Sequence, residues 1–155
     1  MALNDYSVSV RWTGNRGQGT AHYRGYDRTW DLCSPQKPVV HCSNEPMLGG
    51  DPTLYNPEDM LIGALSSCHM LWFLHLASDA GINVQSYEDS PLARGETLSN
   101  GASRFVDCTL RPRISLLKGA DLHLAEQLHH KAHDVCFIAR SVNFPIHFAA
   151  KYKLI

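Results

Sequence analysis

NPEDMLIGALSSC, residues 56–68, is the stretch from which the fold can be read. Asn56 is a residue type that caps helices, Pro57 suits the first helical position, and the two acids that follow favour the positive end of a helix dipole. The apolar character continues to about Ala80, and Gly81 is placed to end the helix. Because this segment is apolar nearly all round, it predicts a central, buried helix.

The apolar run inside this helix, Leu61 to Ala77, is interrupted by serines and histidines. Its length and polarity predict a buried helix and no membrane span. The first twelve residues carry no unbroken apolar stretch of the secretory kind, so we expect a cytoplasmic protein with no membrane partner. The interrupting residues are Ser66, Ser67, His69 and His75.

Length and composition predict a single domain over residues 1–155. The chain is 44% apolar and 19% charged, which is ordinary for a globular domain. Fourteen basic against fifteen acidic residues leave a net charge of -1, without a run of like charges. This balance argues against a nucleic-acid partner.

Before this helix the sequence predicts strands. Residues 6–12 alternate apolar and polar, the period of a half-buried strand. The glycine-rich turn at 14–19 leads into 21–26, which predicts a hairpin, and 28–33 is a candidate third strand. Residues 34–56 are rich in proline and glycine and predict a long loop across a site or a partner subunit.

After this helix the sequence predicts two strands that form a hairpin with its tip near residues 100–101, and Pro112 marks an edge or an irregularity. Asp121 can cap a second long helix, expected to reach about Ala139, and residues 146–154 alternate as a last strand. The order strand-strand-strand-helix-strand-strand-helix-strand predicts an α+β fold.

Five cysteines in a chain without a secretory signal predict reduced thiols. Cys68 lies mid-helix among apolar residues, where a small buried hydrophobe is the simpler interpretation. Cys136 lies late in the second predicted helix, and His133 and Arg140 beside it favour a thiolate. The two thiols form a redox pair only if their α-carbons lie within roughly 7 Å. A peroxide would then oxidise one thiol to a sulfenic acid, which the other converts into a disulfide.

Asn56 to Leu61, followed by Ala64 and Cys68, resembles the helix motif of the OsmC/Ohr family of organic hydroperoxide reductases. In that family a Pro-Glu pair precedes the peroxidatic cysteine by ten residues, and Glu58 stands ten residues before Cys68. The family's second cysteine corresponds to Cys136, although many members have proline after it and this chain has phenylalanine.

The resemblance implies an OsmC-like fold and an intertwined homodimer. It also implies a peroxidase of the oxidative stress response that reduces organic hydroperoxides to alcohols through a Cys68–Cys136 disulfide. A dithiol of the lipoyl type resets the pair, and we expect no cofactor.

The resemblance further implies an arginine that favours the peroxidatic thiolate and a glutamate, Glu58, that holds it in place. Arg16 matches the family's placement best and Arg28 is the alternative; each is equally well interpreted as a solvated surface residue. Ten residues of straight helix separate Glu58 from Cys68 by about 15 Å. We therefore expect a bent helix or a Glu58 from the partner chain, which favours a homodimer.

Two other functions stay open at this stage. His129, His133 and Cys136 fall within about 60° of one another on a helix, with Cys68 or His69 available as a fourth ligand, so a metal-binding protein is one alternative. A histidine-rich helix face is, however, commonly only solvated. The other alternative is a non-catalytic binder of an apolar ligand. The candidate wall or dimer core comprises Met60, Leu61, Leu65, Met70, Leu71 and Trp72.

Overall fold

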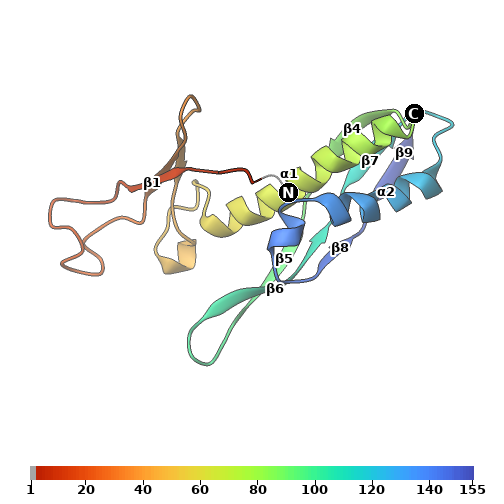
Figure 1. Cartoon of the computed structure of the whole chain (residues 1–155). Helices are drawn as coiled ribbons and strands as arrows, with labels where there is room; N and C mark the ends of the chain where they lie inside the picture. Colours follow the sequence, from red (N-terminus) through yellow and green to blue (C-terminus); the bar gives the residue numbers. More distant parts are fainter. Residues whose placement is uncertain (1–2) are drawn as a thin grey trace. The chain divides into compact units, whose positions relative to one another are not determined.

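The computed structural model describes residues 3–155, in which two α-helices and nine strands form an α+β fold, as the sequence predicts. The chain divides into two compact units, Met1–Leu61 and Ile62–Ile155. Figure 1 follows the elements along the chain. Each unit is described by itself below.

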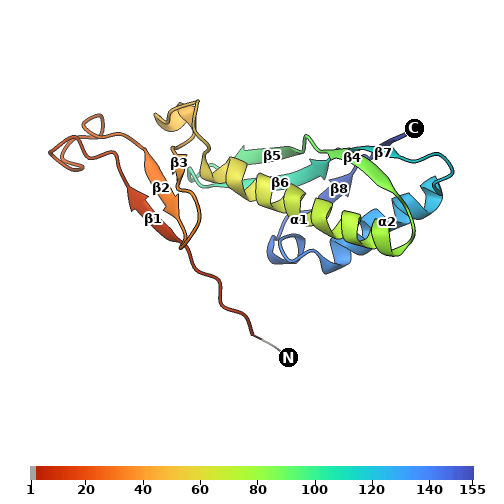
Figure 2. The ribbon, with the colours of Figure 1, turned by 90° about the horizontal axis from the view of Figure 1, so that it is seen from above.

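The first unit contains an antiparallel sheet of β1 (Ser9–Trp12), β2 (Trp30–Cys33) and β3 (Val40–Cys42), visible in Figure 2. The predicted hairpin between residues 6–12 and 21–26 is wrong, because β1 pairs directly with β2 and residues 21–26 form turns.

The loop between β1 and β2 is closed at its base by backbone hydrogen bonds. Asp27 N–H donates to the Gly14 carbonyl at 2.8 Å, and Thr13 N–H donates to the Thr29 carbonyl at 3.0 Å. A β-carbon on Gly14 would lie 1.9 Å from the Asp27 oxygen, so only glycine permits this approach. Pairing between distant residues thus replaces the local hairpin.

Two further expectations for the first unit need correction. β1 is exposed along its whole length in the single chain, although its alternation predicts half-burial; Val10 is 65% exposed. The segment 34–56 is also not all loop. It contains β3 and a 3-10 helix at Pro46–Leu48, and the Tyr55 carbonyl accepts a hydrogen bond from Ser43 N–H.

α1 (Pro57–Asp79) begins and ends as the sequence predicts. Asp59 N–H donates to Asn56 Oδ1 at 2.7 Å, and Asn56 N–H donates to the Asp59 carboxylate at 3.3 Å, a reciprocal cap. Gly81 follows the helix with a φ of 74°, in the left-handed region that glycine tolerates.

The expectation that α1 is buried all round is wrong for the single chain. Only one stripe is buried, at spacings of four residues: Leu65, His69, Phe73 and Ala77. The helix is also long and apolar enough to cross a membrane by length and composition, contrary to the expectation from sequence, with 22% of its apolar window buried. The core helices of soluble proteins share this length and composition.

The second unit contains four strands after α1 where the sequence predicts two: β4 (Val84–Glu88), β5 (Leu92–Thr97), β6 (Ser103–Leu110) and β7 (Arg113–Leu116). Pro112, predicted to mark an irregularity, lies in the break between β6 and β7. The hairpin tip falls where expected, since Leu98 N–H donates to the Ala102 carbonyl.

The predicted last strand is divided into β8 (Ile146–Phe148) and β9 (Lys151–Leu154), which join different sheets. β8 pairs in parallel with β6, in the sheet β5-β6-β8, and β9 pairs in parallel with β7, in the sheet β4-β7-β9. The interruption at residues 149–150 therefore lets residues 146–154 supply an edge strand to each of the two sheets.

α2 (Leu122–Val135) is capped by Asp121, whose carboxylate accepts from Leu124 N–H at 3.0 Å. The helix ends before Cys136, short of the predicted Ala139, because the backbone of Cys136 is extended, with φ -67° and ψ 115°. A short 3-10 turn at Ala139–Ser141 follows. Cys136 is therefore a helix cap and does not lie inside the helix.

The core of the second unit consists of two clusters. The first cluster packs Phe73 and Ala77 of α1 against Leu128 of α2 and Ile114 of β7. The second, here called the cysteine cluster, is formed by the buried residues Leu65, Cys108, Leu110, Cys136 and Ala139, with Cys68 among the partly buried residues packed against it.

Candidate redox site

The cysteine cluster brings Cys68 and Cys136 into direct contact. The thiol of Cys136 donates to the Cys68 sulfur at an S–S distance of 2.8 Å, and both cysteines are free. One sulfur comes from the middle of α1 and the other from the C-terminal cap of α2. The contact between the two thiols that the redox interpretation requires is therefore present within a single chain.

The two thiols differ in their access to solvent. Cys136 is fully buried, whereas Cys68 is partly exposed. A small molecule arriving from solvent thus reaches Cys68 first, and Cys136 is shielded from it. This arrangement suits an attacking thiol backed by a second thiol.

The two thiols also differ in electrostatic environment. Burial, reinforced by the hydrogen bond to Cys68, raises the pKa of Cys136 to about 11. Ala139 N–H donates to the Cys136 sulfur at 3.4 Å and partly offsets this effect. Cys136 is therefore a protonated donor at neutral pH, with its proton directed at Cys68.

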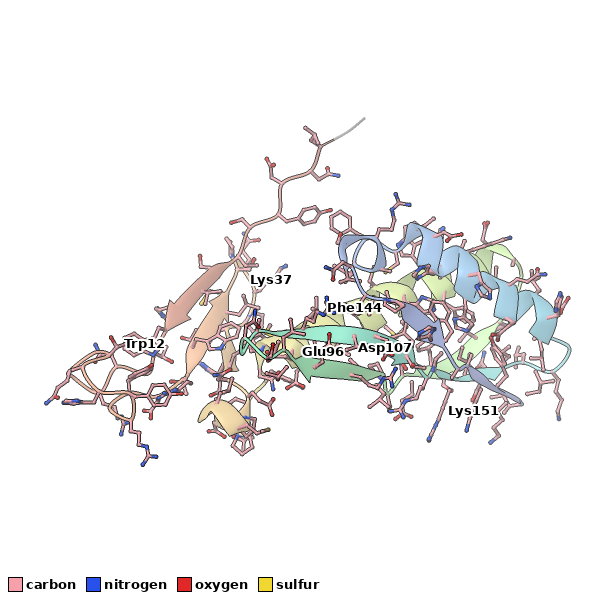
Figure 3. The ribbon with its side chains drawn as sticks, turned by 90° about the horizontal axis from the view of Figure 1, so that it is seen from below. Trp12, Lys37, Glu96, Asp107, Phe144 and Lys151 are labelled. Carbon is pink, nitrogen blue, oxygen red and sulfur yellow. The ribbon has the colours of Figure 1, made fainter. Side chains whose placement is uncertain are left out.

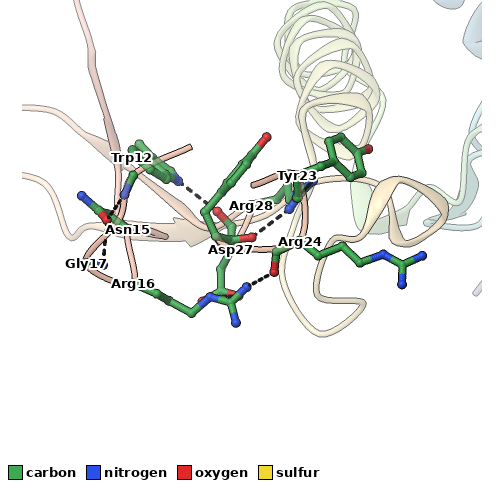
Figure 4. A network of polar contacts seen from close by, with 10 residues as sticks. Trp12, Asn15, Arg16, Gly17, Tyr23, Arg24, Asp27 and Arg28 are labelled. Atoms are coloured by element: carbon green, nitrogen blue, oxygen red, sulfur yellow. Dashed lines mark hydrogen bonds and ion pairs between the residues drawn. The ribbon is translucent and has the colours of Figure 1, made fainter. Parts of the chain in front are cut away.

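Arg16 lies in the loop between β1 and β2, shown in Figure 4. Its guanidinium donates to the Arg24 carbonyl and forms an ion pair with Asp27 at 3.6 Å. Both partners of this pair are about half exposed, with side-chain exposures of 52% and 55%. The charge of Arg16 is thus already partly neutralised in solvent.

Arg28 is held more firmly, by neutral groups. It donates to the carbonyls of Tyr23 and Tyr26, each at 2.8 Å, and its guanidinium carbon lies 4.5 and 4.2 Å from their ring centroids (Figure 4). Within residues 3–155 it forms no ion pair with a carboxylate. Arg28 is therefore an oriented cation with an uncompensated charge.

Glu58 is exposed in the first turn of α1. In the described part of the chain it forms no ion pair with Arg16 or Arg28. α1 is helical without a break between Glu58 and Cys68. A shared site for Glu58, an arginine and Cys68 stays a prediction.

The metal alternative is not assembled by this structure. Among residues 3–155 no three His, Cys, Asp or Glu side chains are grouped to hold an ion. His129 is fully buried and not solvated, and its ring lies 4.3 Å from the Phe73 ring. Cys136 is directed at Cys68 instead.

Sequence reasoning missed a buried histidine pair beside the thiols. His69 Nε2 and His129 Nδ1 share a hydrogen bond of 2.8 Å, and the His69 ring also stacks on Phe148. Burial lowers the pKa of His69 to about 4 and that of His129 to about 3, so both rings are neutral at pH 7. The sequence offered the two histidines only as candidate metal ligands, and it carries no local signal for a hydrogen bond between them.

The apolar candidate wall is divided by the structure. Leu65 is buried in the cysteine cluster, whereas Leu71 and Trp72 are 62% and 37% exposed. Leu71, Trp72 and His75 line a groove of about 240 Å³ on α1. This surface is apolar and uncovered in the single chain.

The fold is α+β, and two free thiols are in contact between α1 and the end of α2. These features are those of a protein with a dithiol site. The chain belongs to the OsmC family, whose model, described as OsmC-like protein, matches residues 50–151. Those residues include Glu58 and both cysteines of the contact, and the match confirms the resemblance seen in the sequence.

Solved structures agree with this assignment. An OsmC-like protein of unknown function from Vibrio cholerae O1 biovar eltor is 26% identical, with a TM-score of 0.86 over 96% of this chain and 100% of that one. An organic hydroperoxide resistance protein from Elizabethkingia anophelis is 18% identical, with a TM-score of 0.69 over 99% and 100%.

A third structure, the organic hydroperoxide resistance protein OsmC from Legionella pneumophila, is 16% identical, with a TM-score of 0.69 over 99% of each chain. At these lower identities the likeness shows the fold alone. No match was found among curated proteins.

Proposed function

We propose that the protein is a thiol-dependent peroxidase that reduces organic hydroperoxides to alcohols. The observation that carries the proposal is the 2.8 Å contact between Cys68 and Cys136. Family membership supports it, as do structural relatives named organic hydroperoxide resistance proteins.

In the proposed cycle the Cys68 thiolate attacks the distal oxygen of the hydroperoxide. The O–O bond breaks, the alcohol leaves with a proton, and Cys68 becomes a sulfenic acid. Cys136 then attacks the Cys68 sulfur, its own proton leaves with the hydroxyl group as water, and a disulfide forms. An external dithiol, for which the lipoyl type is our candidate, reduces that disulfide by exchange and is itself oxidised.

The difference between the two thiols supports this assignment of roles. Cys68 is accessible to solvent and accepts a hydrogen bond from Cys136. Cys136 is buried, and burial raises its pKa to about 11, so it is protonated at neutral pH.

Arg28 is our candidate for the cation that favours the Cys68 thiolate. Its guanidinium is oriented by two carbonyls and has no carboxylate partner among residues 3–155, whereas Arg16 is paired with Asp27. In this proposal Glu58, from the same chain or from a partner, completes the positioning of Arg28.

A homodimer is part of the proposal because the single chain exposes apolar surface on both units. Val10 of β1 is 65% exposed, and Leu71 of α1 is 62% exposed. Large uncovered apolar surfaces usually mark an interface. An intertwined dimer covers such surfaces and can bring Glu58 to a site on its partner. We place this dimer in the cytoplasm, where reduced thiols persist.

The test measures consumption of cumene hydroperoxide with a dithiol reductant by the wild type, Cys68→Ser and Cys136→Ser. Intact mass is recorded after one equivalent of peroxide. We expect Cys68→Ser to lose activity by at least about 10³-fold, because the nucleophile is removed. The disulfide should appear as a loss of two hydrogens that requires both cysteines.

Cys33→Ser is the matched control, since Cys33 is also a partly exposed free cysteine but lies on β2. It should behave as the wild type. Absence of turnover and of any mass change in the wild type would refute the peroxidase proposal and favour a non-catalytic binder of an apolar ligand.

A further inference from the structure

The outer face of the sheet β4-β7-β9 carries a groove lined by basic side chains. Its volume is about 360 Å³. We call it the basic groove; it is lined by Ser86 and Glu88 of β4, Arg113, Ile114 and Ser115 of β7, and Lys151, Tyr152 and Lys153 of β9.

These basic residues point outward because of strand alternation. On β7, Ile114 is 2% exposed and packs in the core, so its neighbour Arg113 faces solvent. On β9, the Tyr152 hydroxyl donates to Glu126 of α2, so Lys151 and Lys153 lie on the opposite face. Figure 3 shows Lys151 on the side of the sheet away from the helices.

Strand pairing gathers the three cations closely. Arg113 is the register partner of Lys151, and Ser115 is that of Lys153. Neighbouring strands lie about 4.8 Å apart, and alternate residues on one strand are separated by roughly 6.6 Å. Three positive charges and serine hydroxyls therefore surround one small area.

The positive charge of the groove is not neutralised within the described chain. Arg113, Lys151 and Lys153 form no ion pair in residues 3–155, although Glu88 is the register partner of Arg113. Like charges opposite one another on a sheet are destabilising. An anion in the groove would remove that repulsion.

We propose that the basic groove binds a small molecule with two adjacent phosphate groups, such as a diphosphate ester. Guanidinium, ammonium and hydroxyl donors together satisfy the many acceptor oxygens of phosphate. The volume falls in the range of about 300–1,000 Å³ found for small-molecule sites. Three cations are too few for a duplex nucleic acid, where 6–10 phosphate contacts are roughly typical.

This site is separate from the proposed redox chemistry. None of the groove residues belongs to the cysteine cluster. Circular dichroism and urea unfolding check the folding of every variant below, so the test of the groove does not depend on peroxide turnover.

The test is titration calorimetry of the full chain with pyrophosphate at low ionic strength. The wild type should bind one pyrophosphate per chain, and Lys151→Gln/Lys153→Gln should weaken binding by at least about tenfold, since each charge-assisted hydrogen bond contributes strongly. Glu88→Gln should tighten binding several-fold, because it removes the one carboxylate that lines the groove.

The controls lie on α2, where Lys131 and Asp134 are exposed. Lys131→Gln removes one positive charge and Asp134→Asn one negative charge away from the groove, and both should leave pyrophosphate binding unchanged. The proposal is overturned if the wild type shows no saturable binding, or if the α2 variants alter affinity as much as the groove variants do.

Discussion

The Cys68–Cys136 pair and the loop between β1 and β2, which holds Arg28, differ in whether a single chain supplies all the partners of their side chains. Cys68 and Cys136 meet inside the second unit, in a core that the chain closes by itself. Arg28 is oriented by its own loop, yet its charge has no carboxylate partner in the region described. The difference indicates that a single chain brings the two thiols together but leaves the charge of Arg28 without a carboxylate partner among residues 3–155.

The largest expected change in the free energy of unfolding distinguishes two neighbouring residues of α1, Phe73 and Trp72. Phe73 is fully buried and stacks on His129, so Phe73→Ala should lower the free energy of unfolding by about 3–5 kcal/mol. Trp72 is 37% exposed, and Trp72→Ala should instead weaken the proposed dimer. Urea unfolding and sedimentation velocity distinguish the two effects.

These two variants also test whether the exposed face of α1 needs a partner, whereas the core beside it does not. If Trp72→Ala lowers the free energy of unfolding as much as Phe73→Ala while the oligomeric state is unchanged, the exposed face of α1 is not an interface. The interpretation of the uncovered apolar surface would then be wrong.

Local signals explain which parts of the fold were predictable. Asn56, Gly81 and Asp121 act on the residues next to them, and all three were placed correctly. The turns at 21–26 were not, because the contact of Gly14 with Asp27 spans the loop. The early end of α2 was missed because Cys136 adopts an extended backbone without a glycine or proline to signal it.

The site was predictable only in part, because its contacts join residues that are far apart in the sequence. Cys68 and Cys136 were identified from the motif and the spacing, but 68 positions separate them in sequence, so only packing could show their contact. The His69–His129 pair was missed because hydrogen bonding between two buried rings leaves no local pattern. Glu58 and the arginines stay predictions, since no ion pair joins Glu58 to Arg16 or Arg28 within residues 3–155.

A second effect concerns the buried histidine pair. Both pKa values are lowered on folding, so the unfolded chain binds more protons below about pH 6.5, and stability must fall as the pH falls towards 4. Between pH 7 and pH 5 we expect a loss of about 2 kcal/mol per histidine. Urea unfolding at the two pH values measures it.

The double variant His69→Leu/His129→Leu removes both partners of the hydrogen bond and should flatten this pH dependence. His123→Leu, at an exposed position of α2, should retain it. An unchanged slope in the double variant would place the acid sensitivity elsewhere in the chain.

A smaller effect should distinguish the two arginines. Arg28→Gln removes the uncompensated charge and should lower kcat/KM for cumene hydroperoxide about tenfold, equivalent to about 1.4 kcal/mol of lost transition-state stabilisation. Arg16→Gln should change little, because Asp27 already pairs with Arg16. The reverse outcome would assign the role to Arg16.

The smallest expected effect is the difference in stability cost, about 1 kcal/mol, between removing the caps that begin the two helices. Asp121→Ala removes one exposed side-chain acceptor, for Leu124 N–H, and should cost about 1 kcal/mol. Asn56→Ala should cost more, about 2 kcal/mol, because Asn56 is buried and its amide also donates to Glu45 at 3.0 Å. Urea unfolding at pH 7 gives both values. Equal costs would mean that the Glu45 contact adds nothing, and that α1 begins by local capping alone, as α2 does.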